Sequence, residues 1–535
     1  MIFQKTVSKK IVLGFIIYLL ILASFVAKGV IALDSDFGWH IQMGKLISKG
    51  KIPVTDPFSY TMPSFPYIDH EWLTNLFMYR IFSVSGKFSL SLIAGLISVW
   101  SLNITMTSSP HLRAGFPLKE DDISAFNSSS RLNRGVFLNA VINNPLSRGV
   151  IKKNGVFLLV FYSLLLLGAS SILRYSGIRP QIESWLFLAI LLKLVMNEKA
   201  WGKWKYMIPP LFVLWVNVHA SFVAGLAVLI LVFTLRFFRT RRFKNELWVI
   251  GLSFFATLLN PYGIKVWSRV LGEMWLQASD PSLRWAINEW TPAFISLNLP
   301  LIVLIPFSFA LLWRYRQRLF LEEIGTFMMF FILGMTSIRH VPLWIIVALP
   351  LVYLCIVYLY LDIKEVLNAK SKFKKAAKLI FIISLFVFIL ESFSEVNGAR
   401  WASEENYYPA KAIEFLKSDL PEENIFSEYT WGGYLIWKLP EKKVFIDGRM
   451  PSWKRSGSSS GESEYALEDY RNIILGNINY EELFNKYKIH TVVYPRPDEV
   501  KPGTFNLIKR ISKDGWELVY EDQVTVVYRK SEKSL

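Results

Sequence analysis

Long apolar runs separated by short polar segments occupy most of the chain. Most of these runs reach the length of about 17–20 residues that lets a helix cross roughly 30 Å of hydrocarbon. We therefore predict a polytopic α-helical membrane protein with about eleven spans. They cover residues 11–33, 72–100, 155–172, 181–197, 206–218, 219–237, 246–262, 299–313, 320–337, 341–361 and 376–393. The 206–218 segment is short enough to be half of a helix broken against its neighbour.

Basic residues mark alternate connections between these runs. Because cytoplasmic loops are rich in Lys and Arg, this pattern predicts a cytoplasmic N-terminus. The run 11–33 is too long for the core of a cleaved signal peptide, so we expect it to remain as the first span. The protein is then a multi-pass component of an inner or plasma membrane, with residues 394–535 outside. The basic connections are 101–154, 198–205, 238–245, 314–319 and 362–375, the first of which is a long polar insertion.

The pattern changes after residue 393, where short strand-like and helix-like segments alternate. Helices are predicted at 410–417 and 480–488, and the Trp431-Gly432-Gly433-Tyr434 sequence reads as a turn into another helix. Strands are predicted at 424–426, 443–447 and 490–494, followed by a hairpin of 516–520 and 524–528. We interpret 394–535 as an extracytoplasmic α/β domain that follows a transmembrane domain, 1–393. Residues 454–463 are predicted as a flexible loop.

Composition excludes several classes of function. The chain has 535 residues, 53% of them hydrophobic, and a net charge of +18 from 60 Lys+Arg and 42 Asp+Glu. The basic cytoplasmic loops account for this charge, so no nucleic-acid partner is expected. The single cysteine, Cys355, allows no intrachain disulfide. No phosphate-binding glycine loop, kinase motif set or nucleophile elbow is present, which argues against an ATP-driven pump.

The first outer loop, 34–71, carries the strongest chemical signal. It begins with Asp34-Ser35-Asp36 and ends with Asp69-His70-Glu71-Trp72. Charge at a bilayer boundary is costly unless it meets water, a partner, a metal or a ligand. Carboxylates at such a place suit activation of an acceptor hydroxyl or amide as a general base. Asp34, Asp36 and Glu71 are the candidate catalytic residues.

Further polar residues fall at the outer ends of other spans, which predicts a shared cavity opening outward. Cationic and hydrogen-bonding side chains there suit neutralisation of a departing phosphate. A divalent metal, Mg²⁺ or Mn²⁺, is the alternative, and Asp36 and His40 are spaced to share a helix face as its ligands. Asp447 and Arg449 either pair with each other or reach the cavity. The candidate substrate-binding residues are His40, His70, Arg174, Arg179, Asn217, His219, Arg339, His340, Asp447 and Arg449.

With these motifs the chain resembles the GT-C superfamily of integral-membrane glycosyltransferases. Similar members include protein O-mannosyltransferases, aminoarabinose transferases of lipid A and oligosaccharyltransferase catalytic subunits, and the chain also resembles prokaryotic membrane proteins that share Trp-x-Asn-x-His and Asn-Pro-Tyr-Gly. The resemblance implies that the acid of the family's first external loop falls on Asp34 or Asp36. Asp-Ser-Asp replaces the Asp-Glu pair of the O-mannosyltransferases. Trp431-Gly432-Gly433-Tyr434 is similar to the WWDYG motif of oligosaccharyltransferases but lacks its Asp.

The resemblance implies an inverting transferase that uses a polyprenyl-phosphate sugar as donor, in contact with membrane lipids. The acceptor would be an extracytoplasmic glycan, lipid or protein. Two other readings of the same residues stay open. A polar cavity also suits a lipid-linked sugar flippase or transporter, and the external domain also suits a non-enzymatic scaffold for envelope assembly.

Overall fold

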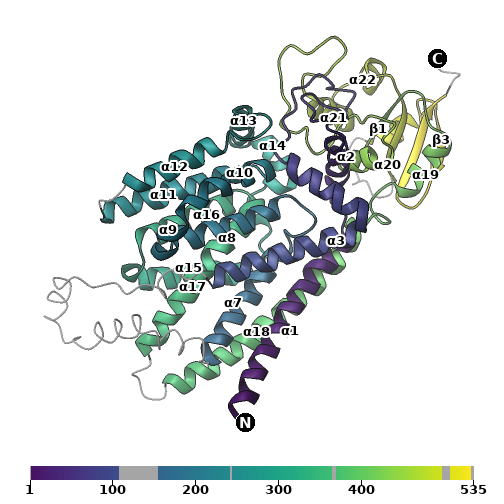
Figure 1. Ribbon diagram of the computed structural model, residues 1–535. Coiled ribbons are helices and arrows are strands. Elements are labelled where there is room, and N and C mark those ends of the chain that lie inside the picture. The colour runs from purple at the N-terminus through teal and green to yellow at the C-terminus, as the bar shows by residue number, and fades with distance from the viewer. Residues whose placement is uncertain (1, 108–154, 241–243, 364–368, 497–505, 532–535) are drawn as a thin grey trace.

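The computed structural model describes residues 2–107, 155–240, 244–363, 369–496 and 506–531. A body of packed helices joins a smaller α/β unit that lies at the end opposite the N-terminus (Figure 1). The predicted insertion 101–154 lies mostly outside the described residues. The helices of the body are α1 (Ile2–Ile31), α2 (Phe37–Ser48), α3 (Trp72–Met106), α7 (Gly155–Leu173), α8 (Gln181–Val195), α9 (Glu198–Trp204), α10 (Ile208–Val218), α11 (Phe222–Thr240), α12 (Lys244–Ala256), α13 (Lys265–Ser279), α14 (Pro281–Ala286), α15 (Leu299–Tyr315), α16 (Leu321–Thr336), α17 (Val341–Ile363) and α18 (Ala369–Gly398).

The described helices include seven that are long and apolar enough to cross a membrane, which makes the chain a multi-pass membrane protein. They are Ile11–Ile31, Trp72–Met106, Gly155–Leu173, Phe222–Arg239, Leu299–Arg318, Ile338–Ile363 and Lys370–Ala402. The other four predicted spans form the shorter helices α8, α10, α12 and α16, of 15, 11, 13 and 16 residues. At about 1.5 Å per residue, each is shorter than the roughly 30 Å hydrocarbon core.

Two interruptions shape the helical body. Gly86 leaves the helical conformation inside α3, with φ of 70°, and kinks the helix there. The apolar run 206–237 is broken at His219, which is extended between α10 and α11. The sequence alternative of a broken helix is therefore what the structure contains.

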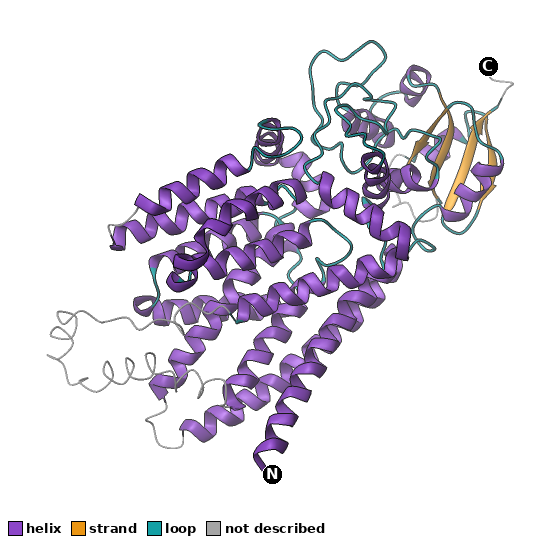
Figure 2. Cartoon of the chain, viewed as in Figure 1, coloured by secondary structure: helices purple, strands orange, loops and turns teal. Residues whose placement is uncertain are grey.

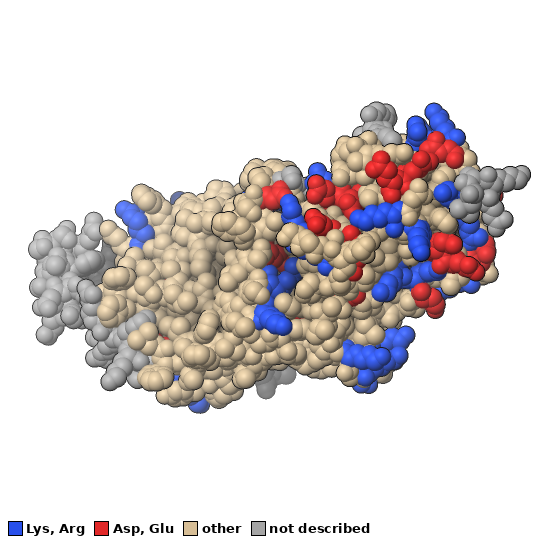
Figure 3. Space-filling model, turned by 90° about the horizontal axis from the view of Figure 1, so that it is seen from above, with Lys and Arg blue, Asp and Glu red and all other residues tan. Residues whose placement is uncertain are grey.

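Where the structure describes them, basic connections meet at one end of the body. Arg239 lies 2.7 Å from Glu322 and 3.9 Å from Glu198, and Arg318 lies 2.9 Å from Asp362. These contacts bring four of the connections together, namely 198–205, 238–245, 314–319 and 362–375. Their placement on the cytoplasmic side stays a prediction. Exposed tryptophans, which favour membrane interfaces, lie at this end (Trp204, Trp248, Trp313) and near the other (Trp275, Trp285, Trp401). Seen from above, Lys, Arg, Asp and Glu gather over the α/β end, while the visible helical body is mostly uncharged (Figure 3).

The C-terminal unit is a four-stranded sheet in the order β1-β2-β4-β3, flanked by short helices (Figure 2). Strands β1 and β2 are parallel, whereas β4 runs antiparallel to both β2 and β3. The predicted helices at 410–417 and 480–488, the strands at 424–426 and 490–494, and the terminal hairpin are confirmed. The elements are α19 (Ala410–Ser418), β1 (Asn424–Ser427), α20 (Gly432–Lys438), α21 (Ala466–Leu475), α22 (Tyr480–Lys486), β2 (Ile489–Pro495), α23 (Leu507–Ile511), β3 (Trp516–Glu521) and β4 (Thr525–Lys530).

The prediction of a strand at 443–447 is wrong. Val444, Phe445 and Ile446 are buried as expected, but they do not join the sheet. Val444 instead forms one bridge with Ser59 of the first outer loop. Its amide donates to the carbonyl of Phe58 at 2.9 Å. The partner of this apolar run lies almost four hundred positions away, so local periodicity could not reveal it.

The first outer loop and the C-terminal unit share one hydrophobic core. Phe37 and Met62 of the loop lie in the same buried cluster as Trp431, Phe445 and Trp453. A second, larger core lies among the spans. The loop also contains α2, which the sequence analysis did not predict. The division of the chain at residue 393 stays a prediction, but the outer loop folds with the C-terminal unit.

Candidate active site

The Asp34-Ser35-Asp36 motif forms the turn between α1 and α2. The amide of Asp36 donates to Oδ1 of Asp34 at 3.0 Å, and α2 begins with the next residue. Leu33 is tied to the turn that follows α18 (Ala399–Ala402), because its amide donates to the carbonyl of Ala402 at 2.8 Å. The motif is thus held at the mouth of the first span, as the sequence predicts.

Asp34 is one of two carboxylates that hold Arg179. Nε of Arg179 donates to Asp34, and the same guanidinium donates through a second nitrogen to Glu289. Burial lowers the pKa of Arg179, but the negative charges of Asp34 and Glu289 raise it by more, so the net shift is upward. Charge-assisted contacts of this kind are the strong ones. They fix a positive charge beside the Asp34 carboxylate.

Asp36 has no such cation of its own. Its Oδ1 atom is buried and has no hydrogen-bond partner within the described part of the chain. Burial, followed by the negative charges of Asp34 and Glu289, raises the pKa of Asp36 to about 8, although the indole of Trp39 and the charge of Arg179 oppose this shift. Asp36 therefore changes its protonation near neutral pH, which suits acid–base chemistry.

A chain of hydrogen bonds fixes His40. Nδ2 of Asn75 donates to both carboxylate oxygens of Asp69, at 3.0 and 2.8 Å. Oδ1 of Asn75 lies 2.5 Å from Nδ1 of His40. Burial raises the pKa of Asp69 to about 6, and burial lowers that of His40. This contact uses one ring nitrogen of His40 and orients the other.

Glu71 lies between two histidines. Its Oε1 atom is 3.5 Å from Nε2 of His70 and 3.4 Å from Nε2 of His219. Burial raises the pKa of Glu71, but His70, His219 and His40 outweigh it and lower the pKa to about 2. Burial lowers the pKa of His70, but Glu71 more than compensates and raises it. Glu71 is therefore an ionised partner that favours a charged His70.

His219 occupies the break between α10 and α11. Its Nδ1 lies 2.7 Å from Oγ of Ser221 and 3.1 Å from Oγ of Ser184. The extended backbone at His219 turns the imidazole toward Glu71 instead of continuing the helix. The Trp-x-Asn-x-His motif thus places a histidine in the polar cluster.

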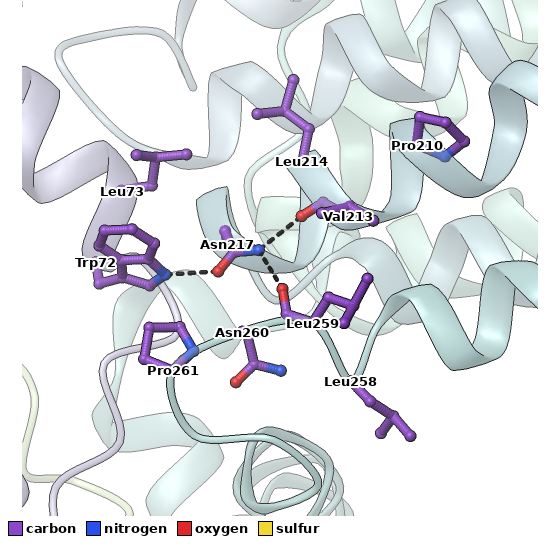
Figure 4. Close-up of a pocket in the computed structure, with 10 residues that line it drawn as sticks. All are labelled: Trp72, Leu73, Pro210, Val213, Leu214, Asn217, Leu258, Leu259, Asn260 and Pro261. Carbon is purple, nitrogen blue, oxygen red and sulfur yellow. Dashed lines mark hydrogen bonds between the residues drawn. The ribbon is translucent and has the colours of Figure 1, made fainter.

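An apolar groove begins next to this cluster. Asn217 organises it: Oδ1 accepts from Nε1 of Trp72 at 2.7 Å, and Nδ2 donates to the carbonyls of Val213 and Leu259 at 2.7 and 2.9 Å (Figure 4). The amide of Asn217 is thus engaged with protein. The groove has a volume of about 610 Å³ and is lined by Trp72, Leu73, Pro210, Val213, Leu214, Asn217, Leu258, Leu259, Asn260 and Pro261.

Three other predicted residues have neighbours of their own. Arg174 donates to the carbonyl of Ser296 at 2.9 Å. Arg339 lies 3.8 Å from Glu273, and its guanidinium faces the ring of Trp290 at 5.8 Å. His340 follows it in the turn Ile338–His340, and its Nδ1 is buried. Their predicted role in substrate binding stays a prediction.

Asp447 and Arg449 form a buried ionic cluster. Of the two predicted alternatives, the structure shows them paired with each other. Two nitrogens of Arg449 donate to Asp447 at 2.8 and 2.6 Å, and a third lies 2.9 Å from Asp56 of the outer loop. Rings of Trp39, Phe58, Tyr67 and Trp453 surround the guanidinium at 5.0–5.9 Å. The pair therefore joins the outer loop to the C-terminal unit.

Residues 454–463, predicted as a flexible loop, also contact the outer loop. Arg455 donates to Oγ of Ser64 at 2.9 Å, and Ser64 donates to Glu462 at 2.7 Å. Both ends of this segment are thus tied down.

The described residues contain no group of three or more His, Cys, Asp or Glu side chains placed to hold a metal ion. Asn75 already engages Nδ1 of His40. That contact leaves Nε2 of His40 available, but within the described residues no third ligand joins Asp36 and His40. A divalent cofactor stays a sequence prediction.

The structure adds residues that sequence reasoning did not assign to the site. Glu289 completes the Arg179 contact, and Asn75 links Asp69 to His40. Glu183, half-buried on α8, accepts from the hydroxyl of Thr74 at 2.6 Å. An acid within an apolar run was an available signal for Glu183. No local signal existed for Asn75.

No family model matches the chain, and no curated protein matches its sequence. Among solved structures, the chain is similar to the crystal structure of ArnT from Cupriavidus metallidurans in the apo state. The match covers 99% of this chain and 98% of the ArnT chain. The two chains share 11% sequence identity, with a TM-score of 0.42. A likeness of this size assigns neither a family nor an activity.

Proposed function

We propose that the protein is a membrane glycosyltransferase that moves a sugar from a polyprenyl-phosphate donor to an extracytoplasmic acceptor. One observation carries this proposal. Acidic side chains and fixed cations lie together at the mouth of the first span, and an apolar groove lies beside them. Lipid-phosphate sugar transfer needs both a base for the acceptor and positive charge for the phosphate. The groove supplies a surface for the lipid chain.

Asp36 acts as the base in this proposal. The acceptor oxygen or nitrogen attacks the anomeric carbon of the sugar while Asp36 takes its proton. The bond between that carbon and the phosphate oxygen breaks, and its electron pair leaves with the polyprenyl phosphate. A single displacement of this kind inverts the anomeric centre. No step requires a metal.

Arg179 and His70 stabilise the departing phosphate. Arg179 is held beside Asp34, and His70 is favoured in its charged form by Glu71. Glu71 thus acts through His70 and His219 and does not itself exchange a proton near neutral pH, because its pKa is lowered to about 2. Preorganised charge of this kind is an effective way to stabilise a transition state.

The transfer rate is expected to rise with pH as Asp36 loses its proton. A general base is active when ionised, so the rising limb of kcat/KM should be half-maximal near the pKa of about 8. A falling limb should follow at higher pH, where His70 loses the proton that stabilises the phosphate. Initial rates between pH 5.5 and 9.5 in lipid nanodiscs measure the profile. A rate that is flat, or that falls across this interval, would remove Asp36 as the base.

Filling the groove is expected to weaken donor binding selectively. In Leu214→Trp the indole displaces part of a lipid chain, and losing burial of two methylenes costs about 1.6 kcal/mol, or roughly a tenfold rise in KM. A donor with a short prenyl chain should be less affected. Leu252→Trp is the matched control, because Leu252 is a similarly exposed leucine of α12 that does not line the groove. Equal effects of both variants would exclude the groove as the lipid site.

A further inference from the structure

Glycines of the C-terminal unit lie directly against the Asp34-Ser35-Asp36 turn. A Cβ atom on Gly448 would collide with Oδ1 of Asp36, and one on Gly433 would collide with the carbonyl oxygen of Ser35. The contact is reciprocal, because a Cβ on Gly38 would collide with the carbonyl oxygen of Gly433. Gly433 and Gly448 belong to the Trp-Gly-Gly and Asp-Gly-Arg sequences, which take no part in the chemistry proposed above.

The backbone that carries Gly448 is rigidly held. The amide of Arg449 donates to Oδ1 of Asp447 at 2.9 Å, and the amide of Met450 donates to the carbonyl of Asp447 at 3.1 Å. The buried cluster with Asp56 anchors this turn to the outer loop. Gly448 thus presents a fixed backbone surface to the Asp36 carboxyl group, with no side chain that could move aside.

We propose that Gly448 and Gly433 are positioning residues for Asp36, so that the C-terminal unit forms one wall of the active site. The close approach of Gly448 excludes water from Oδ1 of Asp36, which has no hydrogen-bond partner among the described residues. A carboxyl group enclosed in this way resists ionisation and keeps a single orientation. The catalytic part of this inference rests on the proposed function, whereas the contact itself does not.

The contact is tested by a double-mutant cycle on the full chain in nanodiscs. Gly448→Ala is expected to lower Tm because its methyl group meets the Asp36 carboxyl group. The same change in an Asp36→Ala background should lose at least half of that effect, since the colliding atoms are gone. Gly251→Ala is the control, because a Cβ there meets no atom within 4 Å. If Gly448→Ala alone gives too little protein to measure, recovery of yield in the double variant is the expected result.

The effect on Asp36 is read without any turnover. Dicyclohexylcarbodiimide reacts with protonated carboxyl groups in apolar surroundings, and mass spectrometry locates the adduct on the Asp36 peptide. Labelling of the wild type is expected to fall to half near pH 8, and Gly448→Ala should shift this midpoint to lower pH as the carboxyl group meets water. In transfer assays Gly448→Ala should lower kcat more than it changes KM.

The outcomes separate the inference from the proposed function. An additive cycle, or an unchanged labelling midpoint in Gly448→Ala, would overturn the positioning role even if the wild type transfers sugar. A coupled cycle and a shifted midpoint in a protein that transfers no sugar would support the positioning of Asp36 and reject the transferase.

Discussion

Asp36→Ala is expected to lower kcat by about 10²–10⁴-fold, the usual contribution of a general base. The substitution removes the only side chain assigned to accept the acceptor's proton. It should leave the fold intact, because Oδ1 of Asp36 has no hydrogen-bond partner within the described residues. Transfer of labelled sugar by purified variants, together with Tm and elution volume, measures both effects.

Asp36→Asn provides the sharper comparison. It keeps the shape of the side chain and removes the base, so its kcat should fall as far as that of Asp36→Ala. Asp419→Ala is the control for removing an aspartate, since Asp419 pairs with Arg529 in the C-terminal unit. Near-normal transfer by Asp36→Asn would show that another group takes the proton.

Arg449→Ala is expected to lower the free energy of unfolding of the first outer loop and the C-terminal unit, which share one core, by about 3–5 kcal/mol. Removing one partner of a buried ionic cluster leaves the remaining charges uncompensated. Here both Asp447 and Asp56 would lose their cation, at sites with side-chain exposure of 0%. Because the cluster ties the outer loop to the C-terminal unit, proteolysis of the outer loop should accelerate in parallel. Chemical denaturation followed by limited proteolysis measures both.

Arg510→Ala is the matched control. Arg510 pairs with Asp514 one helical turn away and its side chain is 59% exposed, so the change should cost less than about 1 kcal/mol. Comparable losses in the two variants would mean that the Arg449 cluster does not hold the outer loop.

The sequence was sufficient to predict the elements whose signals are local. Long apolar runs gave the seven strongest spans, and alternating short segments gave most of the C-terminal elements. Charge patterning placed Asp34 and Arg179 in one polar region, and the two are paired in the structure. Their placement on the outer side of the membrane stays a prediction. For the short apolar helices such as α10 the number of crossings stays a prediction, because hydropathy does not distinguish a full crossing from a partial one.

The pairings within the site were not predictable from the sequence. Arg179 and Glu289 are 110 positions apart, and nothing local marks Glu289 as the partner. The Asp-Gly-Arg sequence had two open readings, and only the tertiary arrangement showed its arginine joined to Asp56. Gly448 matters because it has no side chain, and this can be recognised only once the structure shows Asp36 packed against it.

The most direct test of the central claim is turnover of a panel of radiolabelled polyprenyl-phosphate sugars by the purified protein in lipid. The account predicts that label leaves at least one donor for an acceptor or water, and that Asp34→Ala and Asp36→Ala lose this turnover. If every donor stays intact, the transferase is contradicted. Intact donors that cross the bilayer would identify a flippase instead, whereas donors that neither react nor cross would favour a scaffold.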